Sequence, residues 1–309
     1  MERGSPAPVL IDTDPGIDDA LALLLAWGSP EVRVEAVTTV AGNVRVEDAT
    51  LNVYRLIELR APNPAPRVGR GAGGPLARRL RMATRYHGRD GLGDVPSWEL
   101  SDVRSVFDAG PEPGVPLLVE TARRFGAALT LVALGPLTNV AIAVTSDRQA
   151  MGRVGRVVAM GGAVDVPGNV TAEAEFNVHV DPEAAGVVLD AGLSLDLVPL
   201  DATRQATLMR RELEAALARC PGPVATRVAE FTRRAFRRHA GAMHLHDPLA
   251  VAVVVDPALV EWEAVRLEVD AGGATRRVPG APNCRIATRV DRARLLATLL
   301  PRLCAGQAR

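Results

Sequence analysis

The sequence predicts an α/β protein with a single doubly wound, mainly parallel sheet flanked by helices. Apolar runs of strand length alternate along the chain with longer segments of helical period, the pattern of successive βαβ units. Hydrophobic residues make up 48% of the 309 residues, enough for a large buried core. No internal repeat or low-complexity tract interrupts the pattern, so we expect residues 1–309 to form one domain.

The first βαβ unit is the clearest part of this pattern. Residues 9–11 predict a buried strand and residues 18–27 a helix, which ends at the Gly-Ser-Pro signal of residues 28–30. Residues 32–40 predict a second strand and residues 46–60 a second helix. Strand, helix, strand and helix in this order are typical of the start of a doubly wound sheet.

The later segments continue the alternation. Strands are expected at 129–134, 156–160 and 193–200, and helices at 136–146 and 182–191. Three further regions are less regular: long loops over the sheet at 69–113, one or two Arg-rich helices at 209–240, and two or three strands with a terminal helix at 259–303. We therefore expect the C-terminal third to cover the core rather than to extend the alternation.

Charge and cysteine content narrow the classes of partner. Basic and acidic residues number 36 each, so no net field favours nucleic acid, and the Arg-rich run 232–239 reads as a solvated helix face. Every basic residue is Arg, which excludes any mechanism that needs a lysine. The three cysteines, Cys220, Cys284 and Cys304, are odd in number and lack CxxC spacing, which argues against a disulfide framework.

The N-terminal segments are not expected to carry a targeting signal. Residues 1–8 contain no apolar core of a secretory signal, and the apolar run 21–27 is far shorter than the roughly 20 residues that cross a bilayer. We expect a soluble cytoplasmic protein with no membrane partner.

Four carboxylates converge at the end of the first predicted strand. Asp12 and Asp14 are two residues apart and share one face of the strand. Asp18 and Asp19 stand at the start of the next helix, where the dipole favours anions. A cation must neutralise so many negative charges, and oxygen ligands favour Ca²⁺ or Mg²⁺. The alternative, that these residues only cap a helix and form a turn, stays open.

A Gly-rich segment matches a second pattern. Residues 69–74, Gly-Arg-Gly-Ala-Gly-Gly, fit the G-x-G-x-x-G fingerprint of dinucleotide-binding proteins. Pro75 and the weakly periodic residues behind it do not look like the opening of a cofactor helix. We therefore interpret this segment as a loop.

The run from Asp12 to Asp19, DTDPGIDD, resembles the signature of the nucleoside hydrolase family, which includes inosine-uridine preferring and pyrimidine-specific nucleoside N-ribohydrolases. Seven further segments match in the family's order: TVAGN at 39–43, YHGRDG at 86–91, LGPLTN at 134–139, MGG at 160–162, GN at 168–169, EFN at 175–177 and HDPL at 246–249. The resemblance spans residues 9 to about 250 and is specific.

The resemblance implies a nucleoside hydrolase-like fold with a Rossmann-related core and a Ca²⁺-dependent cleavage of ribonucleosides to ribose and free base. Asp14, Asp19, Asp247 and the Leu134 carbonyl would bind the ion. Asp14 would also be the base that activates a metal-bound water. The transition state would resemble an oxocarbenium ion.

The resemblance assigns the remaining roles to side chains along the same segments. The predicted ribose contacts are Asp18, Asn43, Asn169, Glu175 and Asn177. His246 would protonate the departing base, because imidazole titrates near neutral pH, and His87 would lie near the 5′ end or the base. Family members take part in purine and pyrimidine salvage and are commonly homodimers or homotetramers.

Several alternatives remain beside this interpretation. A phosphohydrolase of the haloacid dehalogenase type also begins with a strand ending in DxD, but it relies on a downstream lysine that this chain lacks. A Ca²⁺-stabilised scaffold without activity is a second alternative. The segment 163–167 could admit another ribosyl compound. Base preference stays open.

Side chains near the predicted base are the hardest to place. We interpret His244 as a loop or packing residue. Beside the solvated-face interpretation of the Arg-rich helix, the resemblance leaves open that this helix closes over the base. The candidates for contact with the base are Phe231, Arg234 and His239.

Overall fold

The computed structural model describes residues 5–95, 98, 110–238 and 240–303, and within them the core is one nine-stranded sheet. Its strands in chain order are β1 (Ala7–Thr13), β2 (Val32–Thr39), β3 (Arg67–Arg70), β4 (Glu112–Pro113), β5 (Thr130–Ala133), β6 (Arg156–Met160), β7 (Leu195–Val198), β10 (Val260–Val265) and β13 (Cys284–Val290). Their order across the sheet is β10-β13-β7-β6-β5-β1-β2-β3-β4.

The strand order confirms a mainly parallel, doubly wound sheet. Every neighbouring pair is parallel except β10 with β13. From β1 the chain first adds β2, β3 and β4 on one side and then β5, β6 and β7 on the other. The direction of winding therefore reverses between β1 and β5, and open α/β sheets bind their ligands in the crevice at such a reversal.

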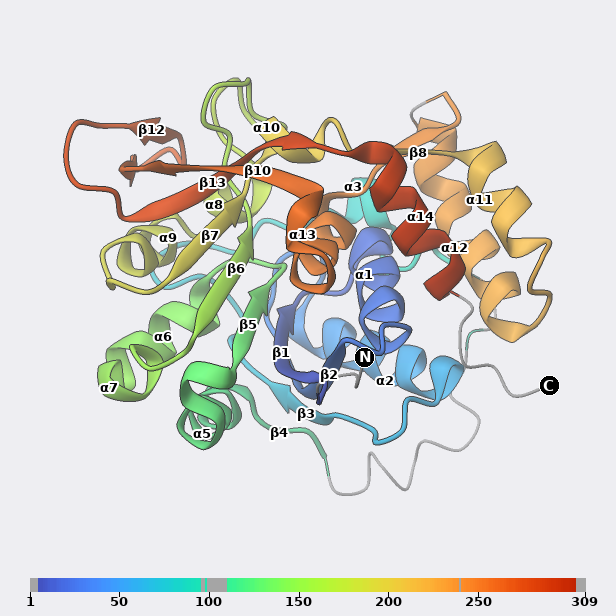
Figure 1. The fold of residues 1–309 in the computed structure, drawn as a ribbon, viewed down its shortest axis with the longest axis horizontal. Helices are drawn as coiled ribbons and strands as arrows, with labels where there is room; N and C mark the ends of the chain where they lie inside the picture. The colour runs from blue at the N-terminus through green and yellow to red at the C-terminus, as the bar shows by residue number, and fades with distance from the viewer. Residues whose placement is uncertain (1–4, 96–97, 99–109, 239, 304–309) are drawn as a thin grey trace.

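Helices cover both faces of the sheet (Figure 1). One face is covered by α1 (Ile17–Trp27), α2 (Val46–Arg60), α11 (Arg210–Leu217), α12 (Pro223–Arg238), α13 (His246–Val255) and α14 (Arg292–Leu303). The other face is covered by α5 (Gly114–Phe125), α6 (Thr138–Ser146), α7 (Arg148–Met151) and α9 (Pro182–Leu189). Successive residues of a strand point to opposite faces of the sheet. In β1, Ile11 packs against the helices of the first face and Leu10 against those of the second.

Helix α1 fixes the position of the acidic segment. Its residues from Ile17 to Ala26 are all buried, because α13 and α14 pack against it in addition to the sheet. A helix that is apolar all round must be buried on every side, which accounts for its lack of a polar face. This packing holds the N-terminus of α1, with Asp18 and Asp19, at the end of β1.

The remaining elements are short connections. They are α3 (Thr84–His87), α8 (Phe176–Val180), α10 (Leu200–Thr203), η1 (Gly126–Ala128), η2 (Pro257–Leu259) and two pairs of antiparallel strands, β8 (Thr207–Met209) with β9 (Ala242–His244) and β11 (Leu267–Val269) with β12 (Thr275–Arg277). The C-terminal region therefore holds four strands rather than the expected two or three, because β11 and β12 form a separate hairpin.

The fold tests two interpretations of the sequence, that of the Gly-rich segment 69–74 as a loop and that of the cysteines. The loop after β3 is packed tightly, because a Cβ atom at Gly71 would lie 2.3 Å from the Asn139 side chain, and no helix follows it directly. Cys220 takes part in a disulfide bond, whereas Cys284 is a buried free thiol. The expectation against disulfides is therefore wrong at Cys220, since a disulfide requires proximity in space and not a particular spacing in sequence.

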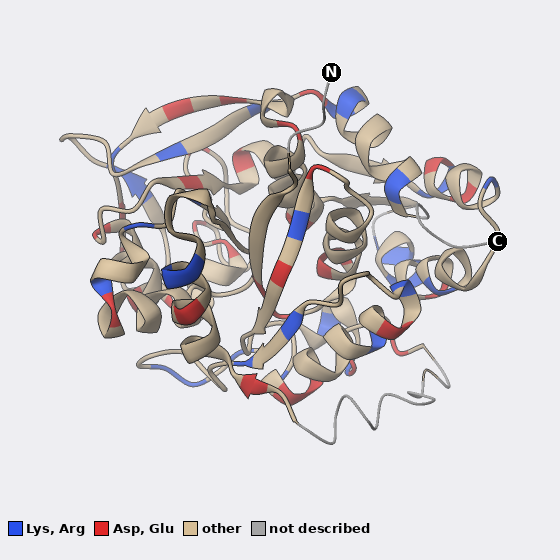
Figure 2. Cartoon of the chain, turned by 60° about the horizontal axis from the view of Figure 1, so that its bottom comes forward, with Lys and Arg blue, Asp and Glu red and all other residues tan. Residues whose placement is uncertain are grey.

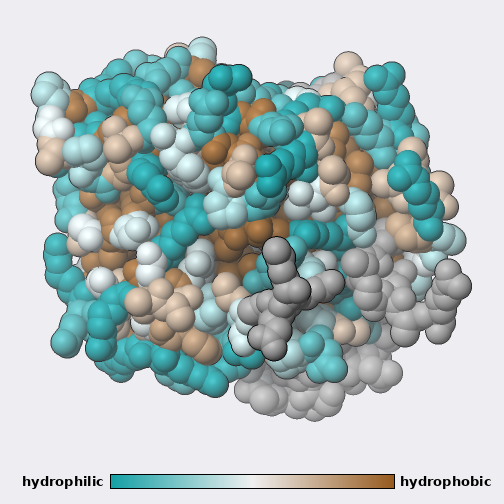
Figure 3. Space-filling view, in the orientation of Figure 1, coloured by the Kyte–Doolittle hydropathy of each residue, from teal (hydrophilic) through white to brown (hydrophobic). Residues whose placement is uncertain are grey.

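On the side of the molecule seen in Figure 2, the described residues of neither charge are concentrated in one place. Figure 2 shows basic and acidic residues interspersed over the helices and strands, as the equal numbers of the two signs lead one to expect. Figure 3 shows hydrophilic side chains over most of one face, with smaller hydrophobic areas between them. Within the described part of the chain, no helix is both long and apolar enough to cross a bilayer.

Candidate active site

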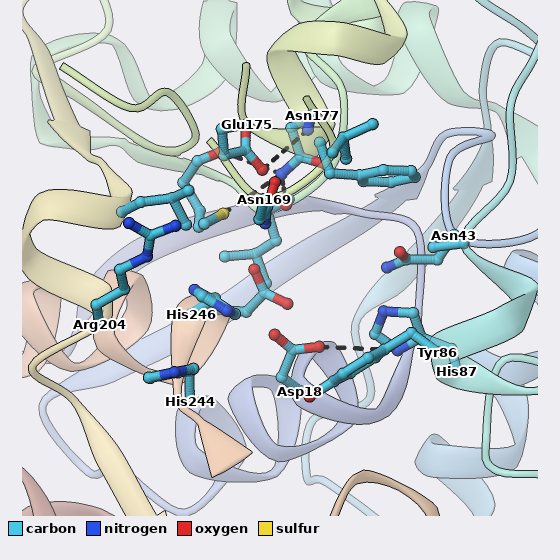
Figure 4. Close-up of a pocket in the computed structure, with 17 residues that line it drawn as sticks. Asp18, Asn43, Tyr86, His87, Asn169, Glu175, Asn177, Arg204, His244 and His246 are labelled. Carbon is cyan, nitrogen blue, oxygen red and sulfur yellow. Dashed lines mark hydrogen bonds and ion pairs between the residues drawn. The ribbon is translucent and has the colours of Figure 1, made fainter. Parts of the chain in front are cut away.

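A cavity of about 380 Å³ opens at the carboxyl ends of the central strands, where the winding of the sheet reverses (Figure 4). Its described lining residues are Asp18, Asn43, Ala83, Tyr86, His87, Leu134, Met160, Asn169, Val170, Glu175, Phe176, Asn177, Leu200, Arg204, His244, His246 and Asp247. The predicted ribose contacts, His87, His246, Asp247 and Leu134 all line it, and Asp14 and Asp19 lie beneath them.

Buried carboxylates form the floor of this cavity. Oxygens of Asp18, Asp19 and Asp247 lie within 4.8 Å of one another, and all three residues are buried. Burial and the neighbouring Asp19 charge raise the pKa of Asp18 to about 7. Burial and the charges of Asp18, Asp19 and Asp14 raise the pKa of Asp247 well above its usual range. The cluster is therefore costly to ionise unless a cation joins it.

Asp14 has one carboxylate oxygen without a hydrogen-bond partner, and its charge acts on the carboxylates of this cluster. Its Oδ2 accepts a hydrogen bond from the Asn43 backbone N–H at 2.6 Å, while its Oδ1 is buried and has no hydrogen-bond partner among the described residues. Burial and the Asp19 charge raise the pKa of Asp14 well above its ordinary value. Gly42 and Gly135 make room, since a Cβ would lie 2.1 Å from Oδ2 or 2.7 Å from Oδ1.

Asp19 is held rigidly in the turn between β1 and α1. Its Oδ1 accepts a hydrogen bond from Thr13 Oγ1 at 2.6 Å. Its Oδ2 accepts from the Gly16 N–H at 2.9 Å and from Asn43 Nδ2 at 3.2 Å. These bonds fix the carboxylate before any ligand binds, so Asp19 is preorganised rather than free to rotate.

Asp12 lies behind the cavity in a buried network. Its Oδ1 accepts hydrogen bonds from Thr38 Oγ1 at 2.5 Å and Asn139 Nδ2 at 2.7 Å. Asn139 also donates to the Thr39 carbonyl at 2.9 Å and accepts from the Ala72 N–H at 2.8 Å. Burial raises the pKa of Asp12 to about 7 despite these bonds. This network ties together the ends of β1 and β2, which carry Asp14 and Asn43.

Glu175 caps the short helix α8 and closes the cavity on the side opposite the acidic floor. Its carboxylate accepts hydrogen bonds from the backbone N–H groups of Gly162 at 3.0 Å, Asn177 at 2.9 Å and Val178 at 3.1 Å. Burial raises its pKa above the usual value, although these bonds oppose the shift. The three bonds fix the Glu175 side chain at the cavity wall.

Asn177 connects this cap to the central strands. Its Nδ2 donates to the Leu134 carbonyl at 2.7 Å and to the Met160 carbonyl at 3.2 Å. A carbonyl oxygen has two lone pairs, so the Leu134 oxygen retains one for a second partner. The predicted carbonyl ligand and a predicted ribose contact therefore touch directly.

His87 is a neutral donor on the same side as Asn43 (Figure 4). Its Nδ1 accepts a hydrogen bond from the Ile17 backbone N–H at 3.0 Å, which leaves the proton on Nε2. Burial lowers the pKa of His87 to about 4, although the Asp19 charge opposes the shift. Its nearest charged neighbour is Asp18, with the Nδ1 and Oδ1 atoms 3.9 Å apart.

His246 faces His87 across the cavity (Figure 4). It is the first residue of α13, and its Nδ1 lies 2.7 Å from Thr203 Oγ1. With the Thr203 hydroxyl on Nδ1, the Nε2 atom of His246 can carry a proton for transfer. Thr203 thus orients the predicted acid, a role that sequence motifs gave no signal for.

Some expected contacts with the base lie elsewhere. Phe231 is fully buried and its ring stacks on Trp98, with centroids 6.2 Å apart. Arg234 donates to the backbone carbonyls of Tyr86 and Arg85 and does not line the cavity. His239 lies outside the described residues.

Eight lining residues were not predicted for the site, and three of them have polar or ionisable side chains: Tyr86, Arg204 and His244. Tyr86 packs edge-on against the His87 ring, with centroids 4.7 Å apart. His244, interpreted from the sequence as a loop or packing residue, lies on β9 and lines the cavity, with its ring centroid 5.5 Å from that of His246. Arg204 follows α10. The motif YHGRDG was the one available signal, and only for Tyr86.

Comparison with known proteins gives one consistent result. Residues 9–297 match the family model described as inosine-uridine preferring nucleoside hydrolase. The pyrimidine-specific ribonucleoside hydrolase RihA of Shewanella sp. (strain MR-7) is 39% identical over 82% of this chain and 79% of its own length. The inosine-uridine preferring nucleoside hydrolase of Leishmania major is 34% identical over 93% of this chain and 94% of its own.

A solved structure agrees with these relatives. A plant nucleoside hydrolase, the PpNRh1 enzyme, superposes with a TM-score of 0.87 at 35% sequence identity, covering 97% of this chain and 99% of that one. The fold and the acidic cavity define a hydrolase that acts on N-glycosyl compounds. The chain belongs to the family of inosine-uridine preferring nucleoside hydrolases.

Proposed function

We propose that this enzyme hydrolyses ribonucleosides to ribose and free base with Ca²⁺ bound at the acidic floor of the cavity. The observation that carries the proposal is the buried Oδ1 of Asp14, which has no partner among the described residues and whose carboxylate interacts with those of Asp18, Asp19 and Asp247. A buried carboxylate oxygen without a donor needs a partner, and a hard divalent cation is the partner that a cluster of oxygens selects.

The donor set fits such an ion. Asp14, Asp19, Asp247 and the Leu134 carbonyl supply oxygen ligands only, and the adjacent Asp18 adds negative charge. Ca²⁺ accepts 6 to 8 oxygen ligands, so positions remain for water and for hydroxyls of the substrate. When bound, the ion neutralises the cluster and makes a nearby water more acidic.

The side chains then divide the remaining work. Asp14, with its raised pKa, accepts the proton of the attacking water. Asp18, Asn43, Asn169, Glu175 and Asn177 bind and orient the ribose, a contribution that lowers the entropic part of the barrier. As the bond to the base breaks, positive charge develops on the ribosyl ring, which the surrounding carboxylates stabilise.

The departing base needs a proton donor on the other side of the cavity. His246 supplies that proton from Nε2, with Thr203 holding its Nδ1. His87 stays neutral at physiological pH because burial lowers its pKa to about 4, so it donates a hydrogen bond without transferring a proton.

The first experiment is release of reducing sugar from inosine, uridine, cytidine, adenosine and their 2′-deoxy forms. Release from ribonucleosides only, lost with a chelator and restored by Ca²⁺, is the expected result. Absence of release from all of them, with Ca²⁺ bound, would redirect the assignment to a modified ribosyl compound or a structural ion.

Replacing His246 by Ala should slow natural nucleosides by about 100-fold or more, the scale of general acid catalysis. Cleavage of p-nitrophenyl riboside should change little, because this leaving group departs without a proton. The measurement is kcat for both substrates in His246→Ala and the parent enzyme. An equal loss for both substrates would contradict an acid role.

The names of the relatives guide the choice of substrates to test. One named relative is pyrimidine-specific and another prefers inosine and uridine, so both base classes belong in the assay panel. A homodimer or homotetramer and a cytoplasmic location remain predictions, for which gel filtration and cell fractionation are the tests.

A further inference from the structure

Arg204 lines the cavity with most of its donors unused. Its NH2 atom donates to the Gly168 carbonyl at 2.9 Å, and among the described residues the guanidinium has no other hydrogen-bond partner and no ion pair. A guanidinium carries five N–H donors and cannot lose its charge. Arg204 is half-buried, so its remaining donors face the cavity and are available to a ligand that displaces water there.

The position of Arg204 separates it from the acidic floor. Figure 4 shows it on the same side as His244 and His246, across the cavity from Asn43 and His87. Among the described lining residues it is the one arginine. A ribose seated on the acidic floor through its 2′ and 3′ hydroxyls would therefore leave Arg204 beside the rest of the substrate, its 5′ end or its base.

The hydrogen bond from Arg204 to Gly168 is not needed to hold the loop that contains Gly168 and Asn169. The turn that carries Gly168 and Asn169 is closed by its own backbone bonds, with Gly168 N–H on the Ala172 carbonyl at 3.0 Å and Asn169 N–H on the Ala174 carbonyl at 3.1 Å. A bridge between Ala174 and Ala274 fastens it to the β11–β12 hairpin as well. The loop thus has anchors that are independent of Arg204.

We propose that Arg204 is a substrate-binding residue that donates hydrogen bonds to an oxygen acceptor outside the 2′ and 3′ hydroxyls. This inference rests on the proposed function. The ribose ring oxygen becomes positively charged as the bond to the base breaks, so a guanidinium there would oppose the reaction. Two other groups of a nucleoside carry such an oxygen: the 5′-hydroxyl and a carbonyl of the base. A guanidinium has no acceptor, so it favours a carbonyl over an amino group at the same ring position.

Three substrates distinguish the two sources. Adenosine differs from inosine by an amino group in place of the ring carbonyl, and 5′-deoxyinosine lacks only the 5′-hydroxyl. In Arg204→Met, kcat/KM for inosine should fall about 10- to 100-fold, the scale of a lost charge-assisted hydrogen bond. A smaller loss for adenosine assigns the contact to the base, and a smaller loss for 5′-deoxyinosine assigns it to the 5′ end.

Two further variants serve as controls. Arg204→Lys keeps the charge and should recover part of the lost activity. Arg148→Met removes an arginine that likewise donates through NH2 to one backbone carbonyl, that of Ala191 at 3.2 Å, but lies away from the cavity. It should leave all three substrates unchanged.

Equal loss on the three substrates in Arg204→Met, or no loss on any, would overturn the proposal and leave a role in the loop alone. Calorimetry measures the binding of the same compounds to the Ca²⁺-loaded parent and variant, in parallel with the turnover assay. Binding that depends on Arg204 supports the contact even if the parent releases no ribose, which would count against the proposed reaction alone. If the parent binds none of them, both proposals fail.

Discussion

The Asp14→Asn enzyme should lose at least about 10³-fold in kcat while its fold stays intact, since a positioned general base contributes about 10² to 10⁴ and the amide also weakens the ion site. Asparagine has nearly the same shape, and its carbonyl oxygen can still accept the hydrogen bond from the Asn43 N–H. Removal of one charge from a mutually repelling cluster should not lower stability in the absence of the ion. Ribose release and thermal unfolding with chelator measure the two effects.

A matched control is available on the opposite face of the sheet. Asp190, at the end of α9, is exposed and far in the fold from the cavity, so Asp190→Asn should change neither activity nor Tm. Turnover of Asp14→Asn within about 10-fold of the parent enzyme would remove Asp14 from the role of base.

Removal of the metal with a chelator should abolish turnover and lower the Tm, and the loss of Tm should grow with pH. The folded-state pKa of Asp18 is about 7, above its ordinary value of 3.8, because burial and the Asp19 charge disfavour the carboxylate. A carboxyl group whose pKa is higher in the folded state contributes fully to the stability of the ion-free fold below its ordinary pKa. This contribution is lost as the pH rises through about 7. Protons also compete with the ion for the same oxygens.

Thermal unfolding at pH 5 and pH 8, with and without Ca²⁺, is the measurement. Ca²⁺ at about 100 times its Kd should add about 2.7 kcal/mol of stability, and its shift in Tm should be larger at the higher pH. Mg²⁺ should restore less, because it requires near-octahedral geometry and gives up its waters reluctantly. Equal Ca²⁺-induced shifts in Tm at both pH values would show that the raised carboxyl pKa values are not the cause of the stabilisation.

The elements that carry the acidic residues could be read from the sequence because local pattern determines them. Strands β1 and β2 and helices α1 and α2 lie within two residues of their expected bounds. Residues Asp14 and Asn43 follow two strands of a parallel sheet, and such strand ends meet at one edge. Family motifs then supplied the more distant partners, Glu175 and Asp247, which the fold brings to the same cavity.

The other wall of the cavity could not be read in this way. His244 reaches it because β9 pairs with β8, and Arg204 reaches it from the position directly after the short helix α10. Thr203, the last residue of α10, is buried and contacts His246 from behind the wall. None of these short elements has a periodic signal of its own. The choice among the candidate base contacts, including Phe231, stayed open for a related reason. The apolar face of α12 is plain in the sequence, but only the packed structure determines that Trp98 covers this ring.

The contact between Asn177 and the Leu134 carbonyl links the ion to the sugar. Under the proposed assignment, one carbonyl oxygen faces the cation while its second lone pair receives the amide that also holds the ribose. An ion bound to this carbonyl holds Asn177 in place through their hydrogen bond. In the same way, a ribose bound to Asn177 holds the carbonyl in place. Thermodynamic linkage then requires reciprocity: nucleoside should tighten Ca²⁺ binding by the same factor by which Ca²⁺ tightens nucleoside binding.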